Sequence, residues 1–418
     1  MMRLLPAGFC ILLILSMIGC SRNSETSTSH SFDSTVEDGV TIVKNTGGPK
    51  YDGELFEYEP IVTLQEDERE ESLLFNPAGF IMDELGFFYV LDTGNRRIAV
   101  FDPDGHYSHS IGGPGRGPGE FQTVRIESIK GDTLTVHDLM LQRISRFQTD
   151  GTLIDTYRLR SEGMQISLSK CVMMPGDLQL QMGVHADQND GMGAENMQIQ
   201  VIAYDVSGDT TWSIQTPYVH VMSRIMVNFG GQEMPMPQFV PFGPVPSVTY
   251  HDRYGIVISP GNGPVLDVYE ANGTHRLHID VVLQEELASD SELENFRNYL
   301  RTQMANNEFM KPMFEAQLAD LPNAAVKAPW RDIEVDDAGF FWLKLPTTIL
   351  GPSPMDSVST YRILSPQGEY LGMSTQPFGT FPRISHGMLL VGHVNPETDK
   401  QTLVAYAIRP IVRGLDYP

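Results

Sequence analysis

The sequence repeats a pattern of strands and turns at an interval of 46 residues. Within each copy, short apolar or aromatic runs alternate with Gly, Asn and Asp turn signals, as in a meander of antiparallel strands. An interval of about 40 to 50 residues is typical of one four-stranded blade of a β-propeller. Four positions carry the repeat: Asp92 with Asp138, Arg97 with Arg143, Phe101 with Phe147, and Gly105 with Gly151.

Turn glycines extend the pattern beyond these two copies. In both copies, a phenylalanine stands four positions before the glycine of the last turn. One such glycine is expected for each blade, so the sequence predicts five complete blades. The same spacing recurs, with an aromatic or aliphatic residue, in three further places: Tyr204 with Gly208, Tyr269 with Gly273, and Leu364 with Gly368.

The residues outside these five blades supply one more. After Gly368 the chain has three apolar runs within residues 381–408, and an orphan run, residues 59–64, precedes the first blade. Pairing the orphan run with the last three strands would complete a blade and leave no unpaired strand edge. We therefore expect an all-β fold, a six-bladed β-propeller over residues 56–418.

Two insertions interrupt the period. The later one maps to about residues 282–328. Ser291 and Glu294 match a capping box there, and apolar residues follow at helical spacing, which predicts a helical hairpin. The earlier insertion, residues 219–246, is rich in Met, Gly and Pro and is expected to form an irregular loop over one face.

The first blade also carries a family pattern. On the residues given below, and on the glycine-rich segment 112–121, the chain resembles NHL-type repeat proteins and bacterial six-bladed propeller lipoproteins. The resemblance is strong in the first blade and fair in the second. It implies ligand contacts at the starts of the innermost strands. The matching residues are Pro77, Gly79, Tyr89, Val90, Asp92, Gly94, Asn95, Arg97, Ile98, Phe101, Asp102 and Gly105.

The amino terminus has the pattern of an export signal. The apolar run 9–18 is too short to span a membrane and suits the core of a signal peptide. It leads into Cys20, in a segment that resembles a bacterial lipobox, where the cysteine thiol receives a diacylglycerol. We expect a lipoprotein signal peptide over 1–19, lipidation of Cys20 and a polar, flexible tether over 20–55. The alternative is an ordinary secretory signal with an incidental cysteine.

The charge of the chain excludes one class of partner. The sequence has 29 Lys and Arg against 53 Asp and Glu, a formal net charge of −24. Affinity for phosphate backbones is built from clustered basic side chains. We therefore expect no nucleic-acid partner.

Three arginines are the candidate binding residues. Arg125, Arg331 and Arg383 lie at or near the starts of the innermost strands of the second, fifth and sixth blades. Around the channel mouth of an acidic protein, they would bind an anionic group through forked hydrogen bonds. The alternative is that each arginine pairs with a neighbouring carboxylate: Glu120, Asp332 or Glu334.

A second polar set, Asp92, Asn95 and Arg97, has a structural interpretation. A short Asp or Asn side chain in a turn accepts hydrogen bonds from backbone N–H groups, and Gly94 supplies a positive φ. We therefore expect these residues to hold the turn between the second and third strands of the first blade.

Four histidines lie near innermost strands and raise the question of a metal. Some NHL-type and lactonase-type propellers hold Zn or Ca in the channel, and zinc needs three or four ligands at one point. No short motif such as His-Glu-x-x-His supports that convergence, so we expect no metal and no cofactor. The histidines are His137, His185, His251 and His386.

Together these features favour a lipid-anchored propeller of the cell envelope, facing the periplasm or the outside. It would act as a non-catalytic binding module for a protein, peptide or glycan, through the channel mouth, the Met-rich loop and the helical hairpin. The alternative is a metal-dependent propeller enzyme of the lactonase or lyase type. A purely structural envelope protein is a third possibility, because propellers host many functions.

Overall fold

The computed structural model describes most of the chain. Cys20 lies outside the described residues, so the expected lipidation, signal peptide and first part of the tether stay predictions. The description covers residues 30–417 except 66–68, 159–165, 168–171, 175, 177, 186–195, 222–223, 239, 262, 347–358, 378, 395–396 and 398–400.

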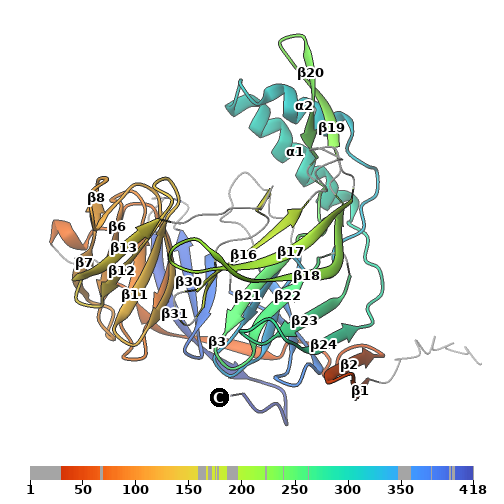
Figure 1. Ribbon diagram of the computed structural model, residues 1–418, viewed down its shortest axis with the longest axis horizontal. Helices are drawn as coiled ribbons and strands as arrows, with labels where there is room; N and C mark the ends of the chain where they lie inside the picture. The colour runs from red at the N-terminus through yellow and green to blue at the C-terminus, as the bar shows by residue number, and fades with distance from the viewer. Residues whose placement is uncertain are drawn as a thin grey trace, which may run out of the picture.

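The first two blades are regular antiparallel meanders of four strands (Figure 1). Blade 1 follows a short 3-10 helix, Glu70–Ser72, and a two-stranded parallel pair, β8 and β9, lies in the loop between the blades. The strands are β4 (Pro77–Met82), β5 (Phe88–Asp92), β6 (Arg97–Phe101), β7 (Tyr107–Ile111), β8 (Gly113–Pro114), β9 (Glu120–Phe121), β10 (Val124–Lys130), β11 (Thr133–Asp138), β12 (Arg143–Gln148) and β13 (Leu153–Arg158).

Blades 3 and 4 depart from the regular pattern. In blade 3, two short strands pair with the same neighbour in place of one inner strand, and in blade 4 the four-stranded sheet is extended by two further strands. The strands are β14 (Ile166–Ser167), β15 (Val172–Met174), β16 (Leu178–His185), β17 (Asn196–Tyr204) and β18 (Thr210–Val221), then β21 (Ser247–His251), β22 (Gly255–Ser259), β23 (Val265–Tyr269) and β24 (His275–Val281).

Blades 5 and 6 complete the ring. Blade 6 takes three strands from the end of the chain and its fourth from the amino-terminal side, β3, which pairs antiparallel with β31. Thr63 lies opposite Val404, so the six-bladed fold and its closure by the orphan strand are confirmed. The strands are β25 (Asp332–Val335), β26 (Phe341–Lys344), β27 (Thr360–Leu364), β28 (Tyr370–Thr375), β29 (Thr380–Ser385), β30 (Met388–Val394), β31 (Gln401–Pro410) and β3 (Phe56–Thr63).

The five turn glycines close the first five blades in the same way. Each has a positive φ between 83° and 93°, and its N–H donates to the carbonyl three residues earlier. A side chain with a Cβ is strained in this conformation, which explains why glycine recurs here. The residues are Gly105, Gly151, Gly208, Gly273 and Gly368.

The segment expected to be a flexible tether is ordered from Ser31 onward. Strands β1 (Ser31–Glu37) and β2 (Val40–Thr46) form a hairpin, and β2 pairs in parallel with the outer strand of blade 4 (Figure 1). The turn residues Asp38 and Gly39 have φ values of 49° and 84°. An Asp-Gly pair in this conformation favours a tight hairpin. The prediction of a tether over 20–55 is therefore wrong for this part.

The two insertions form one module beside the propeller (Figure 1). The late insertion is the expected pair of helices, α1 (Asp290–Asn306) and α2 (Lys311–Ala319). The capping box uses Ser289 and Glu292, two residues earlier than predicted, because the sequence contains two overlapping Ser-x-x-Glu frames. Glu294 instead pairs with arginines on the next turns of α1.

Much of the Met-rich segment, expected to be an irregular loop over 219–246, is a β-hairpin. Residues Arg224–Phe229 form β19 and Gln232–Pro237 form β20, joined by a Gly-Gly turn with positive φ at both residues. Ile225 and Val227 pack against Met313 of α2. The prediction missed this hairpin because Gly and Pro were taken only as loop signals, whereas a two-residue Gly-Gly connection is also a hairpin turn.

Apolar clusters fill most of the junctions between neighbouring blades. Among the described residues, they join blades 1 and 2, 3 and 4, 4 and 5, 5 and 6, and 6 and 1. Within the same residues, no helix is both long enough and apolar enough to cross a bilayer.

Candidate functional site

Two of the three candidate arginines lie on the innermost strands of blades that are not neighbours. Arg125 belongs to β10 of blade 2 and Arg383 to β29 of blade 6, with blade 1 between them. Side chains from these blades can meet only at the propeller axis. Burial lowers the pKa of the Arg383 guanidinium, while the charges of Glu334 and Glu127 oppose that shift and the charge of Arg125 adds to it.

Glu127 holds Arg125 in place. Arg125 donates from Nε and Nη2 to Oε1 of Glu127, at 2.8 and 2.6 Å. The Glu127 side chain is only 6% exposed, whereas that of Arg125 is 30% exposed, so the carboxylate is buried and the guanidinium still reaches water. Strand β10 changes register between Ile126 and Ser128, which sets Glu127 outside the regular ladder. The sequence analysis missed Glu127, because that irregularity is not visible in the residue pattern.

His137 completes the group on the second strand of blade 2. It lies directly opposite Arg125 in the strand register, and its Nδ1 is 3.4 Å from Oε1 of Glu127. The residue is 6% exposed. Neither ring nitrogen has a hydrogen-bond partner within the described part of the chain. Buried polar groups are nearly always hydrogen-bonded, so an imidazole whose only polar contact here is the 3.4 Å approach to Glu127 requires an explanation.

Blade 5 contributes the second carboxylate. Glu334 lies on β25 and its Oε1 accepts the backbone N–H of Ile384, the neighbour of Arg383, at 2.9 Å. We call Arg125, Glu127, His137, Glu334 and Arg383 the axis cluster. It contains two guanidinium groups, two carboxylates and one imidazole, drawn from blades 2, 5 and 6.

The third candidate, Arg331, has different surroundings. It precedes β25, its backbone N–H donates to the carbonyl of Lys344, and its side chain is exposed. Its charged neighbour is Asp332.

The other histidines have separate surroundings. Burial lowers the pKa of His251, which lies in the field of Asp337. His386 is exposed in the turn after β29, and its backbone N–H donates to Asp337 at 2.5 Å. The side chain of His185 lies outside the described residues. None of the described histidines named here belongs to a group of three possible metal ligands within 4.8 Å of one another.

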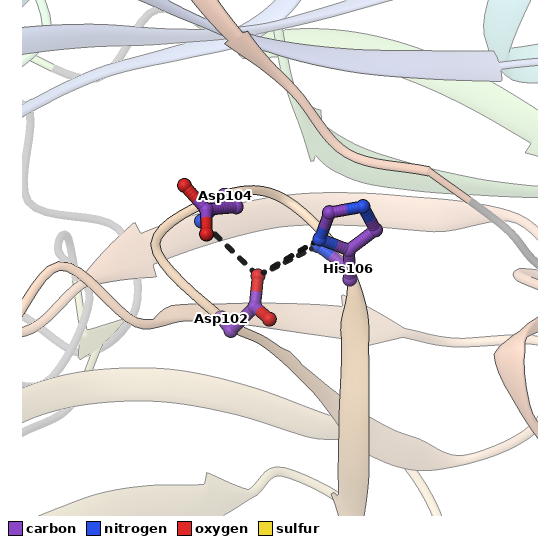
Figure 2. A group of neighbouring side chains, drawn as sticks. All are labelled: Asp102, Asp104 and His106. Carbon is purple, nitrogen blue, oxygen red and sulfur yellow. Dashed lines mark hydrogen bonds and ion pairs between the residues drawn. The ribbon is translucent and has the colours of Figure 1, made fainter.

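One surface turn does have three such ligand atoms: Asp102, Asp104 and His106 (Figure 2). Its geometry has a structural explanation, because Oδ1 of Asp102 accepts the backbone N–H groups of Asp104 and His106 at 3.1 and 2.8 Å. Asp205 closes the equivalent turn of blade 3 through the same two bonds. The carboxylate is thus a turn element.

The turn role of Asp92, Asn95 and Arg97 is confirmed, but the expected positive φ at Gly94 is wrong: Arg96 has it, at 52°. Glycine is needed at position 94 because a Cβ there would lie 2.0 Å from the ring of Phe75. Oδ2 of Asp92 accepts from Asn95 and from Nε of Arg97 at 2.7 and 2.9 Å, and Oδ1 accepts the N–H of Phe75. Arg97 also donates to the carbonyl of Leu73. The set fastens blade 1 to the segment that leads into it.

A buried polar group in blade 4 gives a useful contrast with His137. Asp267 accepts hydrogen bonds from Tyr218 at 2.6 Å and contacts ring nitrogens of His275 and His278 at 2.9 and 2.8 Å. Its pKa is lowered: burial opposes the shift, and hydrogen bonds from His278 and Tyr218 outweigh burial. In return, the hydrogen bond to Asp267 raises the pKa of His278.

Comparison with known proteins agrees with this architecture. A family described as "6-bladed beta-propeller" (DUF5128) matches residues 68–181. No curated protein matches the chain.

Solved structures similar to the chain include three of low sequence identity. A Bacteroides vulgatus member of the DUF4221 family has 14% identity and a TM-score of 0.49, covering 85% of this chain and 99% of its own. A Bacteroides fragilis protein described as exported has 11% identity and a TM-score of 0.46, covering 88% and 99%. Virginiamycin B lyase from Staphylococcus aureus has 9% identity and a TM-score of 0.37, covering 84% and 99%.

Proposed function

We propose that the protein is a lipid-anchored propeller of the cell envelope that binds a protein, peptide or glycan partner without catalysis. Its binding site would be the end of the propeller axis that carries Arg125 and Arg383, with Arg331 outside the site. The proposal of an anchor rests on the lipobox-like segment before Cys20.

The observation that carries the binding proposal is that His137 is buried while neither of its ring nitrogens has a hydrogen-bond partner among the described residues. Burying a polar group without a partner costs about 1–3 kcal/mol, so such a group is unfavourable for the fold alone. The cost is offset when a ligand supplies the missing bonds. Arg125, which lies directly opposite this imidazole in the strand register, provides positive charge that a ligand with an anionic group would use.

A library of peptides and glycans immobilised on a surface would test the proposal. The purified propeller should bind a defined subset of these ligands, and Arg383→Met should lose that binding with an unchanged melting temperature. Arg409→Ala is the matched control, because Arg409 is an exposed arginine of the same blade that pairs with Glu59. Binding that is indifferent to Arg383 would contradict the proposed site.

The enzyme alternative predicts a different outcome. A lactonase or lyase of this type would carry a metal, and the variant with both His137→Ala and His386→Ala would lose it. We expect no bound metal by elemental analysis of the purified protein. Stoichiometric zinc or calcium, with hydrolysis of a lactone that depends on it, would overturn the binding function.

A further inference from the structure

The module of α1, α2 and the β19–β20 hairpin stands beside the propeller and carries exposed apolar side chains (Figure 1). Phe309, in the turn between the two helices, is 80% exposed, the highest value of any large apolar side chain among the described residues. Its ring centroid lies 6.3 Å from that of Phe229, at the end of β19. The helical turn and the hairpin therefore meet through apolar side chains.

The strand register places two methionines on the same face of the hairpin. Residues opposite each other in an antiparallel pair project to the same side. Met234 lies opposite Val227 and Met236 opposite Ile225, and both of these β19 residues are buried against α2. Met234, which is 41% exposed, therefore borders the surface between the hairpin and the helix. Six residues form this surface, which we call the Met-Phe patch: Phe229, Met234, Met236, Phe309, Met310 and Phe314.

The composition of the Met-Phe patch favours a helical partner. Exposed apolar side chains that gather on one surface are typical of an interaction site. Methionine side chains are flexible and polarizable, so a surface rich in them repacks around the apolar face of an amphipathic helix. An extended peptide added to the hairpin edge is disfavoured, because Pro235 and Pro237 of β20 lack the backbone N–H groups that would pair with another strand.

Carboxylates accompany the apolar residues of the patch. Glu233, Glu308 and Glu315 each adjoin a patch residue in the sequence, and all three are exposed. Their side chains form no hydrogen bond or ion pair within the described part of the chain. The basic residues of the same segments are Lys311 and, at the far end of β19, Arg224. The excess of carboxylates here, together with the formal net charge of −24 for the chain, favours a positively charged partner.

We propose that the Met-Phe patch binds an amphipathic helix of a partner protein, with apolar side chains toward the patch and Lys or Arg side chains toward the carboxylates. This surface shares no residue with the proposed site at the propeller axis, so the inference goes beyond the proposed function. A bilayer with anionic lipids is disfavoured as the occupant, because the exposed carboxylates would lie next to negatively charged head groups.

Fluorescence anisotropy with synthetic helical peptides would test the inference on the purified protein. The probe is a labelled amphipathic peptide with Leu on one face and Lys on the other. Two control peptides have the same length: one carries Glu in place of Lys, and one has the Leu/Lys composition in scrambled order. We expect the Leu/Lys peptide to bind more tightly than both controls, with an affinity that falls as the salt concentration rises.

Variants of exposed residues assign this binding to the patch. Phe309→Ser should weaken binding of the Leu/Lys peptide by about 10- to 100-fold, the range for one large apolar side chain buried at an interface. Met226→Gln is the matched control, because Met226 is 57% exposed but alternates with the buried residues of β19 and lies on the other face of the hairpin. It should leave binding unchanged, and both variants should keep the melting temperature of the wild type.

The carboxylates are tested by a double variant, Glu308→Gln with Glu315→Gln. It should weaken binding of the Leu/Lys peptide by about 2- to 10-fold, as for the loss of two exposed ion pairs, and should reduce the salt dependence. Unchanged affinity and salt dependence in this variant would contradict the assigned role of the carboxylates.

Three results would overturn the inference. The first is that the Leu/Lys peptide does not bind, or that all three peptides bind equally. The second is unchanged binding to Phe309→Ser. The third is binding to vesicles of phosphatidylcholine and phosphatidylserine that is lost in Phe309→Ser, without peptide binding, which would assign the patch to a bilayer.

The two proposals fail separately. Arg383→Met should lose the library ligands and keep the Leu/Lys peptide, and Phe309→Ser should do the reverse. If the peptide binds through Phe309 while no library ligand depends on Arg383, the axis site is wrong and the Met-Phe patch stands. If library ligands depend on Arg383 and the peptide does not bind, the helix-binding inference is overturned and the proposed function stands.

Discussion

The two faces of blade 2 are built from the same strands, but one face is apolar and the other is polar. The face toward blade 1 places Ile126, Leu134 and Phe147 in an apolar cluster. The strand register puts Arg125 and His137 on the opposite face, toward blade 3. The first face has the composition of a core, whereas the second carries the Arg125–Glu127 ion pair and a buried imidazole that has no hydrogen-bond partner among the described residues.

The comparison separates the face that stabilises the fold from the face that we propose for ligand binding. Apolar burial stabilises a blade junction roughly in proportion to the area removed from water. The polar face of blade 2 lacks that contribution, and its buried imidazole adds an unfavourable term. We infer that a bound ligand offsets the cost of burying the imidazole on this face.

The largest stability effect is expected on the apolar face. Phe147 is fully buried and its ring meets that of Phe121 edge to face at 5.8 Å. Phe147→Ala should lower the free energy of unfolding by about 3–5 kcal/mol, through lost burial and a cavity. Urea denaturation measures this. A loss below about 1 kcal/mol would mean that the junction of blades 1 and 2 is not a stabilising core.

A buried polar residue that has its partners should also be costly to remove. Asn45 on β2 donates to the carbonyl of Gly368 and accepts the N–H of Tyr370, both in blade 5. Asn45→Ala should cost about 2 kcal/mol, because it leaves buried backbone groups unsatisfied. A neutral result, again by urea denaturation, would show that the amino-terminal hairpin adds nothing to the propeller and would weaken the contrast with His137.

These expectations show how far the sequence alone reaches. The repeat interval and turn glycines predicted six blades and their closure, because each blade contains its own turn chemistry. The placement of Arg125 and Arg383 on inner strands also followed from the repeat. Glu127 and Glu334 could not be assigned to the site, because the position of Glu127 depends on a strand irregularity and that of Glu334 on a backbone contact with the neighbouring blade. The Asp38-Gly39 hairpin was predictable from its turn residues and was missed.

A smaller effect is expected from pH. The hydrogen bond to Asp267 raises the folded pKa of His278 above its usual value of about 6.5. Protonated His278 therefore stabilises the fold fully below pH 6.5, and this contribution is lost as the pH rises through the raised folded value. The melting temperature should fall from pH 6 to pH 8.5 by more in the wild type than in His278→Gln. Equal falls in both proteins would show that the pair contributes nothing.

The most direct test of the account is His137→Leu, measured for stability and for binding together. Since neither ring nitrogen has a partner in the described structure, replacement by an apolar side chain of similar size should leave the free energy of unfolding within about 1 kcal/mol of wild type, or raise it. Binding of a ligand found in the library should weaken by about 2- to 10-fold, as for one lost hydrogen bond. A destabilisation of about 3 kcal/mol with unchanged binding would contradict the account, because His137 would then serve the fold.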